Sequence, residues 1–227
     1  MTKLRDRLLS VVLCIVVGVM MLTFSIGLPI YIRPFYYAHI EPLGIPETTH
    51  YTVAEICAAY DEVLDYLTLP NRPFGTGVFR HSESGMAHFA DCKVLFALNF
   101  WAFVVSAAVV ITLYVLHKTH KIRLCRPWGY SLPCVTGGVM LILCAMIGGV
   151  CALDFETAFE TFHTLFFAGK DNWLFSAKKD EIILALPQKF FMHCAIFIVA
   201  SVVVISLIML IVGIVYKQKK VKLKERL

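Results

Sequence analysis

The stretch from Leu8 to Ile32, LLSVVLCIVVGVMMLTFSIGLPIYI, contains 25 residues and no charged side chain. Three later runs share this character: 94–116 with 23 residues, 127–153 with 27 and 190–216 with 27. A helix needs about 20 apolar residues to cross the hydrocarbon core of a bilayer, and a backbone inside lipid must satisfy its own hydrogen bonds. The sequence therefore predicts four transmembrane helices.

The composition excludes a soluble domain. Hydrophobic residues make up 59% of the 227 residues and charged ones 16%, and the mean hydropathy is +0.74, whereas soluble chains are about half apolar and about a quarter charged. Lys3, Arg5 and Arg7 precede the first run as they do in a signal peptide. That run is too long for a signal peptide and no small-residue cleavage site follows it, so we expect an uncleaved helix.

The loop charges orient the chain. Of the 21 basic residues, 13 lie in the N-terminal tail, in 117–126 and in 217–227, together with only two acids. The segments 33–93 and 154–189 hold the other eight basic residues and 14 acids. The positive-inside rule then places both termini in the cytoplasm and the two acidic segments outside. The net charge of +5 is therefore a signal of topology, and we expect no nucleic-acid partner.

The predicted fold is an all-α membrane protein with four transmembrane helices, a small and mostly helical extracellular cap, and both termini in the cytoplasm. The expected segments are the tail and first transmembrane helix (1–32), the first part of the cap (33–93), the second transmembrane helix (94–116), a cytoplasmic loop (117–126), the third transmembrane helix (127–153), the second part of the cap (154–189), the fourth transmembrane helix (190–216) and a basic tail (217–227).

The first part of the cap contains a helix signal. Thr52-Val53-Ala54-Glu55 matches the capping box, in which the first and fourth residues satisfy each other's free backbone N–H groups. Apolar residues then recur at helical spacing, and Pro70 blocks continuation. We expect an amphipathic helix over Thr52–Leu67, and a second helix that starts near Ser84 and runs into the second span.

The second part of the cap begins with an aromatic pattern. Phe155, Phe159, Phe162 and Phe166 recur at helical spacing, and Gly169 is a typical residue after a helix end. This predicts a helix with an aromatic stripe. A short helical stretch is expected over Asp180–Leu186, with Pro187 opening the fourth membrane helix.

Two of the eight histidines stand apart. His88 and His163 each fall in a predicted helix at the boundary of cap and membrane, and each has an acid three positions away, Asp91 and Glu160. A carboxylate beside an imidazole fixes its tautomer and makes it a better base. A histidine at a membrane interface is also an ordinary structural residue, so both interpretations stand for each position.

Metal and cofactor signals are weak. His88, Asp91 and His163 can supply three zinc ligands, but the sequence has no H-x-x-x-H or H-E-x-x-H motif. There is no G-x-S-x-G elbow, and the absence of C-x-x-C speaks against a thiol oxidoreductase. We expect neither a metal nor a cofactor. Cys57 and Cys92 are the cysteines of the outer segments, and whether they pair stays open.

Two segments now carry a resemblance. His88-Phe89-Ala90-Asp91-Cys92-Lys93 and Phe162-His163-Thr164-Leu165-Phe166-Phe167, followed by Asp171-Asn172-Trp173, resemble the bacterial lipoprotein intramolecular transacylase family. The order of four spans and two outer segments is also similar. The family's first motif reads H-M-x-D-V-K, so Phe89 and Cys92 depart from it, in each case by exchanging one apolar side chain for another.

The resemblance implies a multi-pass enzyme of the bacterial plasma membrane with its active site at the extracellular face. Such enzymes move the sn-2 acyl chain of a diacylglyceryl lipoprotein onto the α-amino group of its own lipidated N-terminal cysteine, which gives the N-acyl lyso-form. The partners implied are that lipoprotein and membrane lipid, and the oligomeric state stays open. The two catalytic histidines of the family correspond to His88 and His163.

The residue types suit this chemistry. One imidazole can take the amine proton and return a proton to the leaving glyceryl oxygen, while the other stabilises the oxyanion or shares the proton transfer. We favour His163 as the base and His88 as its partner. The candidate substrate-binding residues include three charged side chains: Asp91 can orient His88, Lys93 can also be a simple interface anchor, and Asp171 can attract the substrate ammonium or be structural. The candidate walls of the site are Phe159, Phe162, Phe166 and Trp173.

Three other classes of protein are compatible with parts of the pattern. A non-catalytic membrane scaffold or accessory protein would have the same spans and cap. A metal-dependent membrane hydrolase would need the zinc ligands above. An ion transporter would need polar groups through the bilayer centre, where the spans offer little beyond Asn99, Ser106 and Thr136.

Overall fold

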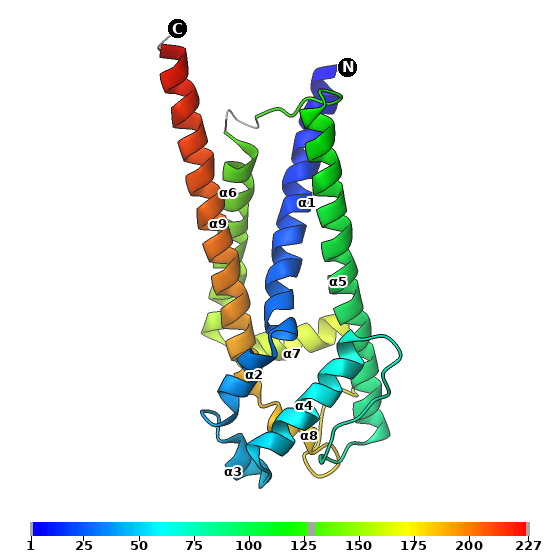
Figure 1. Ribbon diagram of the computed structural model, residues 1–227. Coiled ribbons are helices and arrows are strands. Elements are labelled where there is room, and N and C mark those ends of the chain that lie inside the picture. The colour runs from blue at the N-terminus through cyan, green and yellow to red at the C-terminus, as the bar shows by residue number, and fades with distance from the viewer. Residues whose placement is uncertain (1, 127–129, 226–227) are drawn as a thin grey trace. The chain divides into compact units, whose positions relative to one another are not determined.

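The computed structural model describes residues 2–126 and 130–225, with side chains for 4–126 and 130–215 (Figure 1). The described part is helical and contains no strand. Its helices are α1 (Thr2–Tyr31), α2 (Arg33–Ile40), α3 (Ile45–Thr49), α4 (Val53–Thr68), α5 (Glu83–Lys118), α6 (Leu132–Leu153), α7 (Phe155–Phe166), α8 (Ile182–Ala185) and α9 (Gln188–Glu225).

Four of these helices are long and apolar enough to cross a membrane, which confirms the predicted all-α membrane fold. The crossing segments are Leu4–Tyr31 in α1, Glu83–Lys118 in α5, Leu132–Leu153 in α6 and Gln188–Val215 in α9. The predicted third span begins at residue 127, and residues 127–129 lie outside the described part of the chain. Residues 226 and 227 of the predicted basic tail also lie outside it.

The chain divides into two compact units, and the division passes through all four long helices. Each unit gathers segments that are distant in the sequence. The first unit comprises Met1–Ser25, Phe100–Gly149 and Ile198–Leu227, and the second comprises Ile26–Asn99 and Val150–Phe197.

Small residues let the helices of the first unit approach closely. An added Cβ at Gly137 of α6 would lie 2.7 Å from the Ser206 carbonyl oxygen of α9. Ser10 of α1 is fully buried, and its Oγ accepts a hydrogen bond from the Cys125 N–H at 2.7 Å. Close backbone approach is the usual basis of helix packing in lipid, where no hydrophobic effect drives association.

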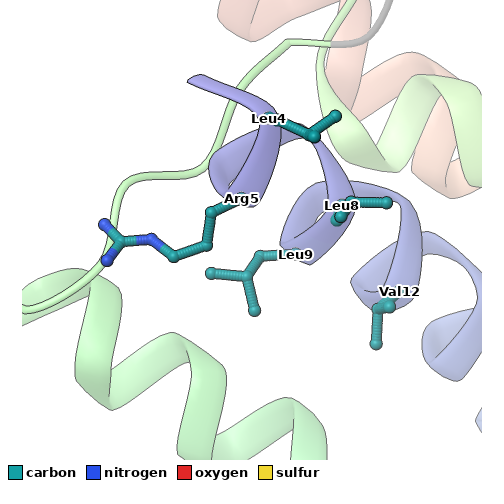
Figure 2. A pocket seen from close by; sticks show the side chains of 5 residues that line it. All are labelled: Leu4, Arg5, Leu8, Leu9 and Val12. Carbon is teal, nitrogen blue, oxygen red and sulfur yellow. The ribbon is translucent and has the colours of Figure 1, made fainter. Parts of the chain in front are cut away.

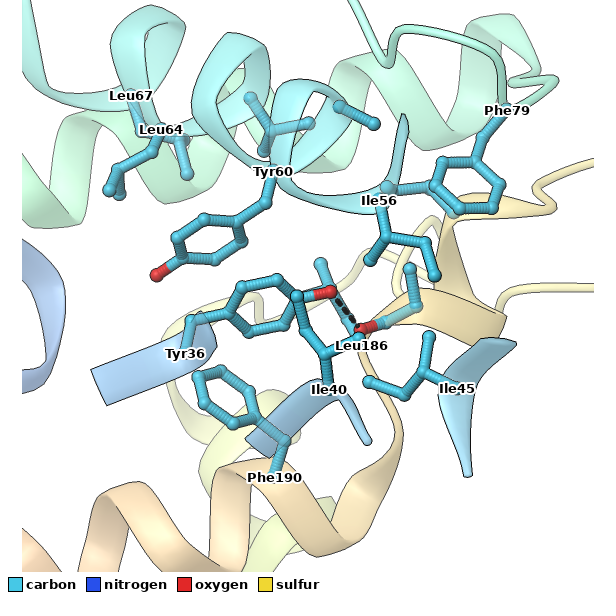
Figure 3. Close-up of a cluster of buried hydrophobic side chains, with 14 of the residues drawn as sticks. Tyr36, Ile40, Ile45, Ile56, Tyr60, Leu64, Leu67, Phe79, Leu186 and Phe190 are labelled. Atoms are coloured by element: carbon cyan, nitrogen blue, oxygen red, sulfur yellow. Dashed lines mark hydrogen bonds between the residues drawn. The ribbon is translucent and has the colours of Figure 1, made fainter. Parts of the chain in front are cut away.

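The second unit has the main apolar core, built by short helices (Figure 3). Tyr36 of α2 stacks on Tyr60 of α4 with ring centroids 3.8 Å apart, and its hydroxyl donates to the Ala185 carbonyl of α8 at 2.8 Å. Ile40, Ile45 and other apolar side chains close around this stack. Arg33, at the start of α2, forms ion pairs with Asp61 and Asp65 of α4. These contacts join α2, α4 and α8 into one body.

The capping box predicted from the sequence is confirmed. The Thr52 hydroxyl accepts from the Glu55 N–H at 3.3 Å, and Glu55 Oε2 accepts from the Thr52 N–H at 2.8 Å. The Thr52 hydroxyl also lies 2.6 Å from Glu55 Oε2 and donates to it, and this bond together with the one from the Thr52 N–H holds the pKa of the Glu55 carboxyl below its ordinary value. The helix that follows matches the predicted one within a residue at each end.

Helices α2 and α3 were not predicted. Each of them contains a proline, Pro34 or Pro46, a residue that interrupts a helix interior. Both prolines lie in the first turn of their helices, where the missing N–H would have no helical partner in any case. Helices α2 and α3 therefore belong to the core of the second unit, although the spacing of apolar residues did not predict them.

Candidate functional site

Helix α7 begins at a strong cap. The Asp154 carboxylate accepts hydrogen bonds from the Thr157 hydroxyl at 2.7 Å and the Thr157 N–H at 3.0 Å, and these bonds hold the pKa of Asp154 below its ordinary value. The cap confirms the predicted helix, which ends at Phe166. His163 is its one buried side chain, with 8% of its surface exposed.

The orientation of the His163 ring is fixed on all sides. Its Nδ1 lies 2.7 Å from the Phe159 carbonyl oxygen, one turn back along α7. A carbonyl oxygen only accepts, so Nδ1 carries the proton and Nε2 carries the lone pair. The ring stacks on Trp173 with centroids 4.9 Å apart and touches the Phe159 ring at 4.3 Å. The His163 ring is thus held with its Nδ1 proton on a carbonyl, so that in the neutral ring the lone pair is on Nε2.

His88 lies on the second turn of α5, and the start of that helix is anchored. The Ser82 Oγ accepts from the Gly85 N–H at 3.0 Å and donates to Asp180 Oδ1 at 2.7 Å, and the Ser82 N–H donates to the same oxygen at 2.8 Å. Asp180 is buried, so this cap ties α5 to the segment before α8. Only 5% of His88 is exposed.

The two histidines meet inside an aromatic enclosure. Their rings are nearly parallel, at 28°, with centroids 5.9 Å apart. Phe167 contacts both rings, at 4.7 Å from His88 and 5.6 Å from His163, and Phe175 packs edge-on against His88. Two imidazoles at this separation can act on one substrate, since general acid–base groups work within hydrogen-bond reach of the reacting atoms.

The thiol of Cys92 faces the His88 ring, one turn further along α5, with Sγ 3.4 Å from Nε2. Cys57 and Cys92 are both free thiols, so the possible disulfide between them is not formed. The spacing of four residues placed Cys92 on the face of His88, and this neighbour could have been read from the sequence.

Asp91 was expected to pair with His88, but its carboxylate bonds two other residues. Lys170 Nζ lies 2.5 Å from Asp91 Oδ1, and Asn172 Nδ2 donates to Asp91 Oδ2 at 2.9 Å. The Trp173 Nε1–H donates to the Lys170 carbonyl at 3.1 Å, which holds this loop in a turn. The carboxylate therefore joins α5 to the loop after α7.

Glu160, the acid expected beside His163, is exposed, and the Phe159 carbonyl bonds Nδ1 in its place. The reason is geometric, because a helical side chain leans back over the preceding turn toward residue i−4.

The other predicted site residues do not all lie at the histidine pair. Phe162 contacts the His163 ring at 5.4 Å and is 46% exposed, and Phe166 packs on Phe162 and is 52% exposed. Lys93 lies over the Tyr66 ring, 4.2 Å from its centroid, which fits an interface anchor better than a group at the histidine pair. Asp171 is exposed in the loop after α7.

Sequence reasoning gave no site role to four residues, Lys170, Asn172, Phe167 and Phe175, although Phe167 and Asn172 lie in the segments that carry the resemblance. Phe167 directly follows the last residue of α7 and lies outside the aromatic stripe. The other three belong to the loop before α8, where no periodic pattern exists. Their role follows from long-range contacts that spacing does not encode.

Other features offer less chemistry. Across 2–126 and 130–225, no group of three or more His, Cys, Asp or Glu side chains is arranged to hold a metal ion. A shallow hollow in the first unit is lined by Leu4, Leu8, Leu9 and Val12 with Arg5 as its one charged side chain (Figure 2). An apolar hollow without convergent polar groups is a poor candidate for catalysis.

A multi-pass helical membrane protein with a buried pair of histidines is thus the class that fold and site define. A model of the family described as lipoprotein intramolecular transacylase Lit matches residues 11–191. The match covers most of the sequence, so the chain belongs to this family of membrane acyltransferases. The family confirms the resemblance seen in the sequence and the expectation of an enzyme.

Solved structures share the fold. One is the in meso structure of the membrane integral lipoprotein intramolecular transacylase Lit from Bacillus cereus, with a TM-score of 0.83 and 24% identity over 99% of this chain and 98% of that one. Two further structures of that protein, with one histidine replaced by arginine or by alanine, give TM-scores of 0.80 at 24% identity, and each covers 96% of this chain and at least 94% of its own. No curated protein sequence matches the chain significantly.

Proposed function

We propose that the protein moves the sn-2 acyl chain of a diacylglyceryl lipoprotein onto the α-amino group of the same molecule's N-terminal cysteine. The observation that carries the proposal is the histidine pair. His163 has its Nδ1 proton engaged by the Phe159 carbonyl, and its ring stacks near the ring of His88. Acyl transfer from an ester to an amine needs a base for the amine and an acid for the leaving oxygen, and imidazole serves as both near neutral pH.

The reaction balances without an external nucleophile. The amine nitrogen attacks the ester carbonyl carbon, and Nε2 of His163 takes the amine proton. The C–O bond to the glyceryl carbon-2 oxygen then breaks, and the same proton goes to that oxygen. His88 is the partner that stabilises the oxyanion or shares the proton transfer. The products are an amide on the cysteine and a free hydroxyl on the glyceryl group.

Positioning is the main contribution of the protein. The tetrahedral intermediate closes an eight-membered ring through the cysteine and glyceryl atoms, so a flexible chain must fold back on itself. Holding reactants in such a geometry accelerates a reaction by reducing its entropy cost. Phe159 and Trp173, which enclose His163, are proposed walls for the folded substrate, and Asp171 is proposed to attract its ammonium group.

The surface beside the site suits a lipid. On α7, Phe162, Leu165 and Phe166 are exposed, and Leu174 in the following loop is 65% exposed. Soluble surfaces rarely leave so many large apolar side chains together in water, and a helix of this kind lies in a membrane interface. We propose that Phe162 and Phe166 contact the acyl chain as it enters, which keeps them in the substrate-binding role expected from the sequence.

The charge distribution supports the orientation. The acidic segments 33–93 and 154–189 hold both histidines, and the basic segments are the two tails and 117–126. We therefore propose a bacterial plasma membrane protein with both termini in the cytoplasm, the segment boundaries given above, and the site at the extracellular face.

Expression in a bacterium whose lipoproteins carry the diacylglyceryl form tests the function. Fragment mass spectra of a lipoprotein's N-terminal peptide are expected to show one acyl chain on the amine and a lyso-glyceryl group, at unchanged total mass. The same spectra with and without a well-expressed protein would overturn the proposal and favour a scaffold. Activity that a chelator abolishes would instead indicate a metal-dependent enzyme.

A further inference from the structure

Building on the transacylase function above, we propose that Asn172 is a positioning residue that fixes which nitrogen of His88 carries the proton. Asn172 lies in the loop after α7, 84 positions from His88 in the sequence. It connects His88 to Asp91 through its side-chain amide, which has a donor nitrogen at one corner and an acceptor oxygen at the other.

The Asp91 carboxylate sets the direction of that amide. An ionised carboxylate only accepts, so the atom of Asn172 that bonds it at 2.9 Å is Nδ2, the donor. Lys170 binds the other carboxylate oxygen and keeps Asp91 charged and in place. The Asn172 Oδ1 must then be directed away from Asp91.

The Asn172 side chain interacts with the His88 ring. Within the described residues, Asn172 Oδ1 and His88 Nδ1 are both buried and neither has a hydrogen-bond partner, and we infer that these two atoms pair with each other. The other ring nitrogen, Nε2, faces the Cys92 thiol. An oxygen acceptor beside Nδ1 requires a proton on Nδ1, because two buried acceptors facing each other would both stay unsatisfied.

His88 is therefore held with its proton on Nδ1 and its lone pair on Nε2, the same form as His163. A neutral His88 in this form can accept a proton at Nε2 but cannot donate from it. Once Nε2 takes up a proton, it becomes a donor for the oxyanion or the leaving oxygen, while Asn172 and Asp91 hold the ring in place. The arrangement couples the oxyanion role of His88 to its protonation.

The first measurement needs no activity. Two-bond ¹H–¹⁵N spectra of the full-length protein with ¹⁵N-histidine, in detergent micelles, report the tautomer of each ring, and the His88 signals are assigned by their loss in His88→Ala. We expect the native His88 to carry its proton on Nδ1, and Asn172→Ala to give a mixture of tautomers. A native His88 protonated on Nε2 would overturn the proposal, whether or not the protein transfers acyl chains.

Kinetics supply the second measurement. Asn172→Ala and Asp91→Asn should each lower kcat for acyl transfer by about 10- to 100-fold with little change in KM, as is typical when the group that orients a functional histidine is lost. The double variant should be no slower than Asn172→Ala, because both changes break the same connection. Lys178→Ala, an exposed change in the same loop, is the control and should match the native rate.

The outcomes separate the two proposals. The expected tautomers in a protein that transfers no acyl chain would leave the role of Asn172 intact and reject the proposed function. Native activity that is unchanged in Asn172→Ala and Asp91→Asn would reject the role of Asn172. Thermal unfolding midpoints, read by circular dichroism, identify any variant whose loss is one of folding, and Asp91→Asn then serves where Asn172→Ala does not fold.

Discussion

Replacing His163 with alanine is expected to slow acyl transfer by about a thousandfold or more while the protein still folds. General acid–base groups contribute about 10²–10⁴ to a rate, and this imidazole carries a free Nε2 and a proton-bearing Nδ1 bonded to a carbonyl. The measurement is the initial rate of conversion of a synthetic diacylglyceryl lipopeptide, followed by mass spectrometry, with circular dichroism to confirm the helical content.

Two further substitutions separate chemistry from packing. His163→Asn can keep a donor near the position of Nδ1, toward the Phe159 carbonyl, but loses the atom at Nε2, so it should be as slow as alanine. His117→Ala removes an exposed histidine of α5 and should leave the rate unchanged. Substantial activity in His163→Asn would mean that His163 only fills space, and the base would then have to be sought elsewhere.

Gly85→Ala is expected to destabilise the protein by about 2–4 kcal/mol, the combined cost of overpacking and of a displaced buried carboxylate. Alanine is more favourable than glycine in a helix by about 1 kcal/mol, so helix propensity alone would predict that Gly85→Ala stabilises the protein. At this position a Cβ would collide with Asp180 Oδ1 and come within 3.1 Å of Phe175. Asp180 cannot move freely, because it is buried and accepts two hydrogen bonds from Ser82.

The matched control is Gly138→Ala in α6, where nothing lies within 4 Å of the added Cβ. That change should be neutral or slightly stabilising. Thermal unfolding in one detergent should place the Gly85→Ala midpoint roughly 5–15 °C below the native one. An unchanged midpoint would show that the Asp180–Ser82 cap is not tightly held.

The sequence predicted the parts of this fold that follow from local physics. The four spans come from runs of apolar residues, the start of α4 from Thr52 and Glu55, and α7 from the spacing of its phenylalanines. His88 and His163 were found because each falls in such a regular segment near a membrane boundary. Patterns of this kind act over one or two helical turns and can be read without a structure.

The rest depends on contacts between distant residues. Asn172 and Lys170 lie in an irregular loop, and their pairing with Asp91 spans about eighty positions. Helix α2 is short and starts with a proline, and its place in the core rests on the stacking of Tyr36 on Tyr60. The expected pairing of Glu160 with His163 was wrong because a backbone carbonyl competes for the same nitrogen.

Helix α7 reverses the arrangement of an amphipathic helix in a soluble protein. Its one buried side chain is the histidine, while Phe162, Leu165 and Phe166 face outward. The medium that surrounds this helix is therefore in contact with the helix face opposite His163. If the proposed site is the active site, the detergent or lipid chosen for purification borders it, and we expect the rate of acyl transfer to depend on that choice.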